Sequence, residues 1–164
     1  MKLLVKTALL AGGIAVSFSA LAHDPKAHAA NSVTSLIDEQ AQPAVAVVEQ
    51  FSKALQSANF DQVRALLADD VLILESGGAE RSREEYLGHH AISDATFLKG
   101  AHVQVKQRTA RVEGPLAWVG TESELHATKD GKALTLLSTE TMILKKTGAD
   151  WRIVHIHWSS RPKK

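Results

Sequence analysis

Cysteine is absent from the 164-residue chain, so it can form no disulfide bond, no thiolate metal site and no thiol nucleophile. An excess of charge of one sign is also absent: 19 lysine and arginine residues stand against 18 aspartate and glutamate residues, and the formal net charge is +1. This balance does not attract a phosphate backbone, which argues against a nucleic-acid partner. The chain has no nucleophile motif, phosphate-binding loop or dinucleotide fingerprint, so we expect no cofactor.

What is present is the composition of one globular domain, 45% hydrophobic and 23% charged, and residues 1–22 are expected to be a signal peptide rather than an uncleaved membrane anchor. Lysines come before an apolar run from Ala8 to Phe18, and Ala20-Leu21-Ala22 fits the small-x-small pattern at a cleavage site. We expect cleavage between Ala22 and His23 and a periplasmic or secreted protein. No second apolar run is long enough to span a bilayer, so no membrane association is expected after cleavage.

Residues 23–42 are expected to form a flexible tail, either disordered or a loosely docked short helix, because small and polar residues dominate and few side chains could pack. The folded domain is expected over residues 43–162, beginning with a helix from Pro43 to about Ala58. A short second helix, capped by Asn59 or Asp61, should end before Asp69-Asp70. Apolar residues recur at helical spacing in the first helix: Val45, Val48, Phe51 and Leu55.

The rest of the chain predicts a strand, a helix and a long meander. Val71–Glu75 reads as a short strand, and Ser82 and Glu85 have the capping-box spacing that should start a helix from Arg83 to about Ala91. Short turns then separate strands that must pair as antiparallel hairpins: His102–Val112, Leu116–Thr128, Ala133–Lys146 and Trp151–Ser160. The predicted class is α+β, with helices on a strongly curved, mainly antiparallel sheet that forms a cone with an internal pocket.

The order of these elements, and four segments of the sequence, resemble the nuclear transport factor two-like superfamily. Within it the chain is similar to the SnoaL-like domains and to the association domain of calmodulin-dependent protein kinase. The segments are FDQVRALLADDVLILESGG, EYLGHH, STETMILKKTGADW and WRIVHIHWSS. The resemblance covers about residues 43–162 and implies the cone-shaped fold and a homodimer. Isomerases, cyclases, dehydratases and non-catalytic modules share this fold, so the resemblance implies no single reaction.

Strand alternation makes Glu140 a candidate pocket residue. It shares a face with four apolar residues, so it is a carboxylate on an otherwise apolar surface. Glu140 could contact a ligand, or it could be a buried acid paired with a histidine or with Arg108. The opposite face of this strand is half apolar and would suit a dimer interface. The apolar neighbours are Leu134, Leu136, Met142 and Leu144.

The resemblance to the kinase association domain implies further pocket residues. It places Met142 inside the cone, and it implies that Trp158 and the position of Gly120 face the cavity. The last position would bring Trp118 and Glu122 to the cavity as well.

The expected helix from Arg83 adds two histidines. Tyr86 and His90 lie four residues apart, as do Glu85 and His89, so one histidine should point into the cone. A neutral imidazole near a buried glutamate could act as a general base, or it could only hold the helix on the sheet through hydrogen bonds. Glu75 has the same two possibilities, because it could contact a ligand or cap the glycine loop that follows it.

Two pairs of histidines are candidates for a metal site. His155 and His157 share a face of the last strand, where a third ligand would be needed, and a bulge could bring His157 to the pocket rim. Cleavage after Ala22 would give an N-terminal His23 with His28 within reach, an arrangement that copper favours.

The leading hypothesis is an exported homodimer that binds a small organic molecule in the cone. One alternative is an isomerase- or dehydratase-like enzyme that uses His90 and a buried glutamate such as Glu140; the other is a copper- or zinc-binding protein that uses the histidine pairs. The candidate ligand-binding residues are Glu75, Tyr86, His89, His90, Trp118, Glu122, Glu140, Met142, His157 and Trp158.

Overall fold

The computed structural model describes residues 34–129 and 131–164, and the predicted signal peptide, His23 and His28 lie outside these ranges. The chain begins there with β1 (Thr34–Ile37) and a single 3-10 turn, η1 (Glu39–Ala41). The helices are α1 (Gln42–Gln56), α2 (Phe60–Leu66), α3 (Arg83–Gly88) and α4 (His90–Lys99). The remaining strands are β2 (Leu67–Glu75), β3 (Gly78–Glu80), β4 (His102–Glu113), β5 (Leu116–Lys129), β6 (Lys132–Thr147) and β7 (Asp150–Pro162).

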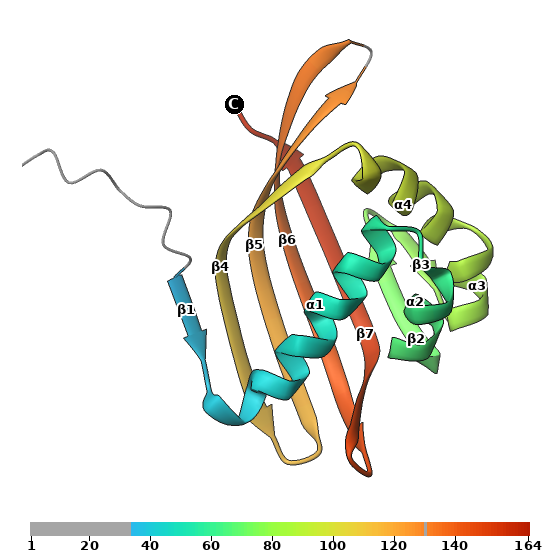
Figure 1. The fold of residues 1–164 in the computed structure, drawn as a ribbon, viewed down its shortest axis with the longest axis vertical. Coiled ribbons are helices and arrows are strands. Elements are labelled where there is room, and N and C mark those ends of the chain that lie inside the picture. Colours follow the sequence, from blue (N-terminus) through green and yellow to red (C-terminus); the bar gives the residue numbers. More distant parts are fainter. Residues whose placement is uncertain (1–33, 130) are drawn as a thin grey trace, which may run out of the picture. The chain divides into compact units, whose positions relative to one another are not determined.

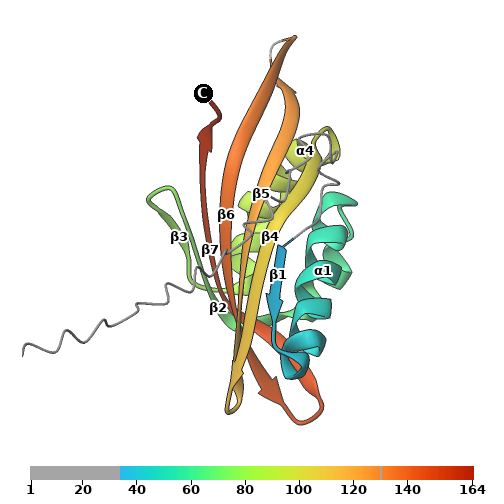
Figure 2. The same cartoon turned by 90° about the vertical axis from the view of Figure 1, so that its left-hand side faces the viewer.

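One seven-stranded sheet organises the domain, in the order β1-β4-β5-β6-β7-β2-β3. Strands β4 to β7 form the predicted antiparallel meander, whereas β1 pairs with β4, and β2 with β7, in parallel. Helix α1 lies along one face of these strands, and the view turned by 90° shows α1 and α4 on the same side of the sheet (Figures 1 and 2). The predicted α+β class, with helices packed on a curved sheet, is confirmed.

The core lies between α1 and the inner face of the sheet. Pro43 stands in the first turn of α1, and the apolar stripe that follows is buried, including Val48 and Phe51. Opposite this stripe, one residue from each of five neighbouring strands is fully or almost fully buried, and these residues are direct cross-strand partners. This apolar row consists of Ala110, Val119, Met142, Ile156 and Ile73.

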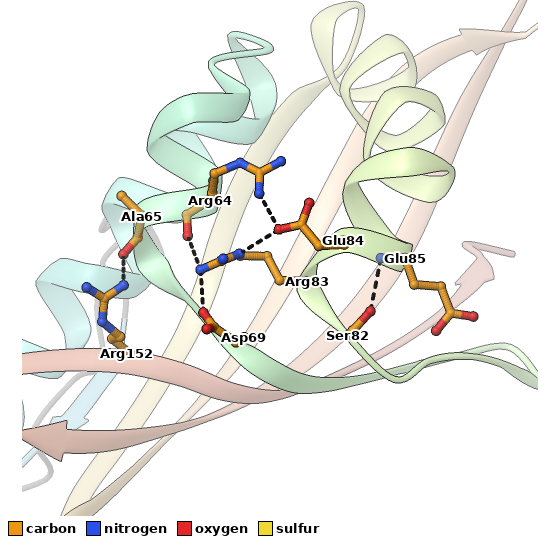
Figure 3. A network of polar contacts seen from close by, with 8 residues as sticks. All are labelled: Arg64, Ala65, Asp69, Ser82, Arg83, Glu84, Glu85 and Arg152. Carbon is orange, nitrogen blue, oxygen red and sulfur yellow. Dashed lines mark hydrogen bonds and ion pairs between the residues drawn. The ribbon is translucent and has the colours of Figure 1, made fainter.

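Polar contacts fasten α2 and α3 to the sheet (Figure 3). Arg83 of α3 forms an ion pair with Asp69 of β2 at 2.7 Å and donates to the carbonyl of Arg64 in α2 at 3.4 Å. Arg64 in turn pairs with Glu84, and Arg152 of β7 donates to the carbonyl of Ala65 at 2.6 Å.

The predicted cap of α3 forms, with one difference. The Ser82 hydroxyl accepts from the Glu85 amide at 3.1 Å, as expected. The Glu85 carboxylate, however, accepts from the amide of Arg81 at 2.7 Å rather than from that of Ser82. The start of the helix was therefore predicted correctly, but the reciprocal half of the capping box was not.

Two segments differ from the sequence analysis. Residues 34–42 are not a tail, because they form β1, η1 and the first residue of α1; β1 adds to the edge of β4 through backbone bonds, which need no apolar side chains. The helix expected to end near Ala91 is two helices, separated at His89, and the second continues to Lys99. Among the described residues, no helix has both the length and the apolar character needed to cross a membrane.

Candidate functional site

A cavity of about 450 Å³ lies between α1, α4 and the inner face of β4 to β7. Its outer end is apolar and open: Val103 and Phe97 are 40% exposed, and Leu125 and Leu136 lie beside Val103 as its neighbours across the sheet. The next row inward carries hydroxyl groups, from Ser123, Ser138 and Ser160. Polarity therefore increases from the mouth toward the interior.

The row after the serines carries the charged side chains. Arg108, Thr121, Glu140, Trp158 and Glu75 are successive partners across β4, β5, β6, β7 and β2, and all of them line the cavity. This transverse row lies directly above the buried apolar row, so it forms the closed end of the cavity. Because side chains alternate along strands, the register alone brings these five residues together on one face.

Glu140 is held at the centre of the transverse row. The indole Nε1 of Trp158 donates to its Oε2 at 2.8 Å. Burial raises the pKa of Glu140, while the hydrogen bond from Trp158, the charge of Arg108 and a hydrogen bond from Thr121 act in the opposite direction. The Arg108 guanidinium is itself engaged, with Glu49 at 2.7 Å and with the Thr121 hydroxyl at 3.3 Å. Among the described residues, Glu140 therefore forms no ion pair with a cation of its own.

Asp94 and Glu75 bring two more carboxyl groups to the closed end. The Tyr86 hydroxyl donates to Oδ2 of Asp94 at 3.0 Å. Burial is the main cause that raises the pKa of Asp94, opposed by this hydrogen bond and by the charge of His90. The pKa of Glu75 is raised by burial and by the charge of Asp94, and lowered by His90. Burial and these acidic neighbours also raise the pKa of Tyr86, so its phenol stays protonated as a donor.

Aromatic rings form one wall of this end. Trp158 stacks on Phe51 with 6.3 Å between ring centroids and meets Tyr86 at 6.1 Å. Tyr86 is fully buried and Phe51 nearly so. The ring of Trp158 and the hydrogen bond from its nitrogen thus connect the helices to the carboxyl group of Glu140.

The predicted site residues divide into those the fold brings together and those it does not. Glu75, Glu140 and Trp158 line the cavity, and the expectation that Glu140 shares the inner face with apolar residues is confirmed. Tyr86 supports the cavity through Asp94. Met142 lies on the inner face but within the buried apolar row, below the cavity. His90 contacts Glu80 and lines a second, smaller cavity.

Five predicted positions are wrong, and one of them is Gly120, which pairs with Thr141 on the outer face of the sheet. Trp118 and Glu122 lie on the opposite face of β5, because Thr121 is the residue that pairs with Glu140 on the inner face. His157 pairs with Thr141, also on the opposite face, and is exposed. His89 is exposed at the break between α3 and α4 and lines neither cavity.

Sequence reasoning missed several site residues: Phe51 and Thr121 as lining residues, and above all Asp94. Asp94 follows Tyr86 by eight residues, which is close to two helical turns, so a longer predicted helix would have placed both on one side. Arg108 was considered only as a partner of Glu140, whereas its direct contacts are Glu49 and Thr121.

The predicted metal ligands do not assemble in the part of the chain that the structure describes. There, no group of three or more histidine, aspartate or glutamate side chains is arranged to hold a metal ion. Nδ1 of His155 lies 2.8 Å from the carbonyl of Leu72, which engages that nitrogen in the sheet. The candidate pair His23 and His28 lies outside the described residues.

Comparisons with known proteins agree with this architecture. A crystal structure from Shewanella frigidimarina, described as a candidate ketosteroid isomerase, is 37% identical, with a TM-score of 0.69, over 71% of this chain and 94% of that one. A candidate calcium/calmodulin-dependent protein kinase II association domain from Xanthomonas campestris is 22% identical, with a TM-score of 0.63, over 82% of this chain and 99% of that one. An NTF2-like protein from Novosphingobium aromaticivorans is 16% identical, with a TM-score of 0.61, over 71% and 79%.

No match was found among proteins with curated descriptions. The profile of the SnoaL-like domain, however, matches residues 44–162, which include the whole transverse row, helix α4 and all of α1 except its first two residues. The chain therefore belongs to the SnoaL-like domain family and has the NTF2-like fold.

Proposed function

We propose that this protein binds a small organic molecule in the cavity between α1, α4 and the sheet. The observation that carries the proposal is the increase in polarity along the cavity. The mouth is apolar at Val103 and Leu136, and the closed end holds the carboxyl groups of Glu140, Asp94 and Glu75. Ligand sites typically combine apolar walls with a few convergent polar groups. The ligand should accordingly have an apolar body and a polar group that reaches the transverse row.

We further infer that the closed end can move a proton on the bound molecule, in an isomerase-like reaction. Asp94 and Glu75 are close enough for the charge of Asp94 to raise the pKa of Glu75. Two interacting carboxyl groups release their protons in two separate steps, and between these steps the pair supplies an acid and a base at the same place. The ionised member would take a proton from one carbon and return it to another, while the protonated member would hydrogen-bond the oxygen on which charge develops.

The Shewanella frigidimarina relative, described as a candidate ketosteroid isomerase, supports this reaction type. The original candidate base, His90, does not line the larger cavity. Asp94 does line it and carries a hydrogen bond from a buried tyrosine, so we assign the base to the Asp94–Glu75 pair and a supporting role to Glu140.

The test uses a panel of β,γ-unsaturated ketones, whose isomerisation to the conjugated product is followed by ultraviolet absorbance. Leu136→Trp should fill the cavity mouth and abolish both ketone binding and turnover. Leu116→Trp is the matched control, because Leu116 is 43% exposed at the β4–β5 turn, does not line the cavity and should leave both unchanged. Binding that survives Leu136→Trp would place the ligand elsewhere, and binding without turnover would leave a binding protein.

Export and dimerisation are the remaining parts of the proposal. Export rests on the signal-peptide pattern of residues 1–22. Dimerisation is supported by the outer face of the sheet, where Trp118, Leu137 and Ile143 are only half-buried, and by the fold shared with a kinase association domain. Native mass spectrometry of the protein, expressed with its own signal peptide and purified without chelators, tests these points together. We expect a dimer that begins at His23 and retains an organic adduct. An uncleaved chain would contradict export, and a monomer would contradict dimerisation. Bound copper would favour the alternative in which His23 and His28 bind a metal.

A further inference from the structure

A second cavity, of about 390 Å³, lies behind the closed end of the first. It is lined by Glu75, Ser76, Gly78, Glu80, His90 and Asp94. Of the described residues, Glu75 and Asp94 alone line both cavities. These two carboxyl groups therefore stand between the larger cavity and the smaller one.

The two cavities differ in character. The larger has an apolar mouth, whereas all residues around the smaller one are polar except Gly78. A space of this size with several polar partners can hold water. An apolar ligand would use the first opening, and water and protons would have access to Asp94 and Glu75 from the second.

His90 stands at the second opening in a defined position. It is the first residue of α4, and Asp94 follows it by four residues, so both lie on the same side of the helix. Nδ1 of His90 contacts Oε1 of Glu80, whose side chain is only 6% exposed, while the His90 side chain is 57% exposed.

We propose that His90 is a positioning residue whose positive charge, held by Glu80 at this second opening, favours the ionised forms of Asp94 and Glu75. His90 lines the smaller cavity and not the larger one, so it acts on a bound molecule only through these carboxyl groups. The inference rests on the proposed function only for its effect on turnover. Its effect on the two carboxyl groups holds whatever molecule binds.

The direction of the effect follows from the groups that surround Asp94. Tyr86 of α3 donates a hydrogen bond to it, Glu75 of β2 repels its charge, and Glu80 of β3 holds His90. Glu140 of β6 lies close enough to act on Tyr86. His90 is the positive group in this set, and its charge lowers the pKa of both Asp94 and Glu75 against the effect of burial. Protonated His90 therefore favours the ionised carboxylates that a base requires.

The experiment titrates the carboxyl carbons of isotope-labelled aspartate and glutamate by NMR, with no ligand added. In His90→Gln we expect the titration midpoints of Asp94 and Glu75 to rise by about one pH unit, the low end of what a nearby opposite charge produces. His89→Gln is the matched control, because this neighbouring histidine lines neither cavity, and it should leave both midpoints unchanged. His90→Lys restores a positive charge and should return the midpoints to the wild-type values or below.

Equal midpoints in His90→Gln and His89→Gln, with both variants folded, would overturn the proposal, as would a His90→Lys variant that behaves like His90→Gln. Under the proposed isomerase reaction, His90→Gln should also shift the acid limb of the pH profile of turnover to higher pH and leave KM unchanged. If the wild-type protein isomerises no ketone, the proposed isomerase reaction is wrong. The NMR titration still decides whether His90 acts on Asp94 and Glu75.

Discussion

The polar network around Arg83 and the closed end of the cavity both contain acidic side chains, but the pKa values of these acids shift in opposite directions. In the network, Arg64 and Arg83 face Glu84 and Asp69, whose side chains are 61% and 88% exposed (Figure 3). Hydrogen bonding from Arg64 lowers the pKa of Glu84. At the closed end, burial raises the pKa of Glu75, Asp94 and Glu140.

The difference indicates what each region is for. Acids paired with arginines at the surface stay charged and fasten elements together, for a modest gain in stability. Acids buried without a cation of their own destabilise the fold when they ionise, and such groups gather where a protein acts on a ligand. The two regions should therefore respond oppositely to pH and to the removal of their charges.

The largest expected effect is on turnover in Asp94→Asn. Asparagine keeps the shape and can still accept from Tyr86, but it cannot take up a proton, so turnover should fall about 10²- to 10⁴-fold. The free energy of unfolding at neutral pH should stay equal or rise, since a buried acid is removed. Kinetics with the best ketone and urea unfolding measure the two quantities. Asp69→Asn in the network is the control and should leave turnover unchanged; a comparable loss of turnover there would remove the distinction between the regions.

Glu140→Gln should change how stability depends on pH. Because the folded pKa of Glu140 lies above its ordinary value of 4.5, its contribution to stability is present below that pH and is lost as pH rises through the folded pKa. The glutamine variant does not titrate, so its stability relative to wild type should increase with pH across this window. The gain is on the order of 1 kcal/mol for each unit by which the pKa is raised. Urea unfolding at a series of pH values measures it, and a difference that is constant with pH would contradict a raised pKa.

The elements of the fold could be predicted where a repeated pattern specifies them. The apolar stripe of α1 and the short turns between β4, β5, β6 and β7 were sufficient, and alternation along β6 placed Glu140 on the inner face. Helix α4 gave a weaker signal, because it buries only small residues, Ala91 and Ala95, and exposes Ile92 and Phe97. Because the predicted helix ended near Ala91, Asp94 was not among the predicted site residues.

The rest of the site depends on register, which local patterns do not determine. A bulge between Ile153 and His155 moves both His155 and His157 to the face opposite Ile153, although regular alternation would keep the three residues together. The transverse row likewise exists only once β2 pairs with β7, which sets Glu75 beside Trp158. No local sequence pattern specifies which strands pair when they are about eighty residues apart in the chain, as β2 and β7 are.

Arg83→Met should affect stability alone. It removes the ion pair with Asp69 and the bond to the Arg64 carbonyl, while methionine keeps part of the apolar stem of a side chain that is 19% exposed. The free energy of unfolding should fall by about 1 kcal/mol, typical of polar contacts whose partners reach solvent. Turnover and KM should stay within twofold of wild type. A large loss of turnover in a folded Arg83→Met protein would mean that the network also positions the site through Tyr86.

The smallest effect, and the one opposite in sign to that of Glu140, is expected for Glu84→Gln. Because the folded pKa of Glu84 lies below its ordinary value of 4.5, its contribution to stability is present above that pH and is lost as pH falls through the folded pKa. The variant should be slightly less stable than wild type at neutral pH and equal to it in acid. Molar salt should remove the neutral-pH difference, since the ion pairs with Arg64 and Arg83 are exposed to solvent. Unfolding curves for Glu84→Gln and Glu140→Gln at the same pH values should therefore diverge from wild type in opposite directions, and parallel curves would show that the two regions are not electrostatically distinct.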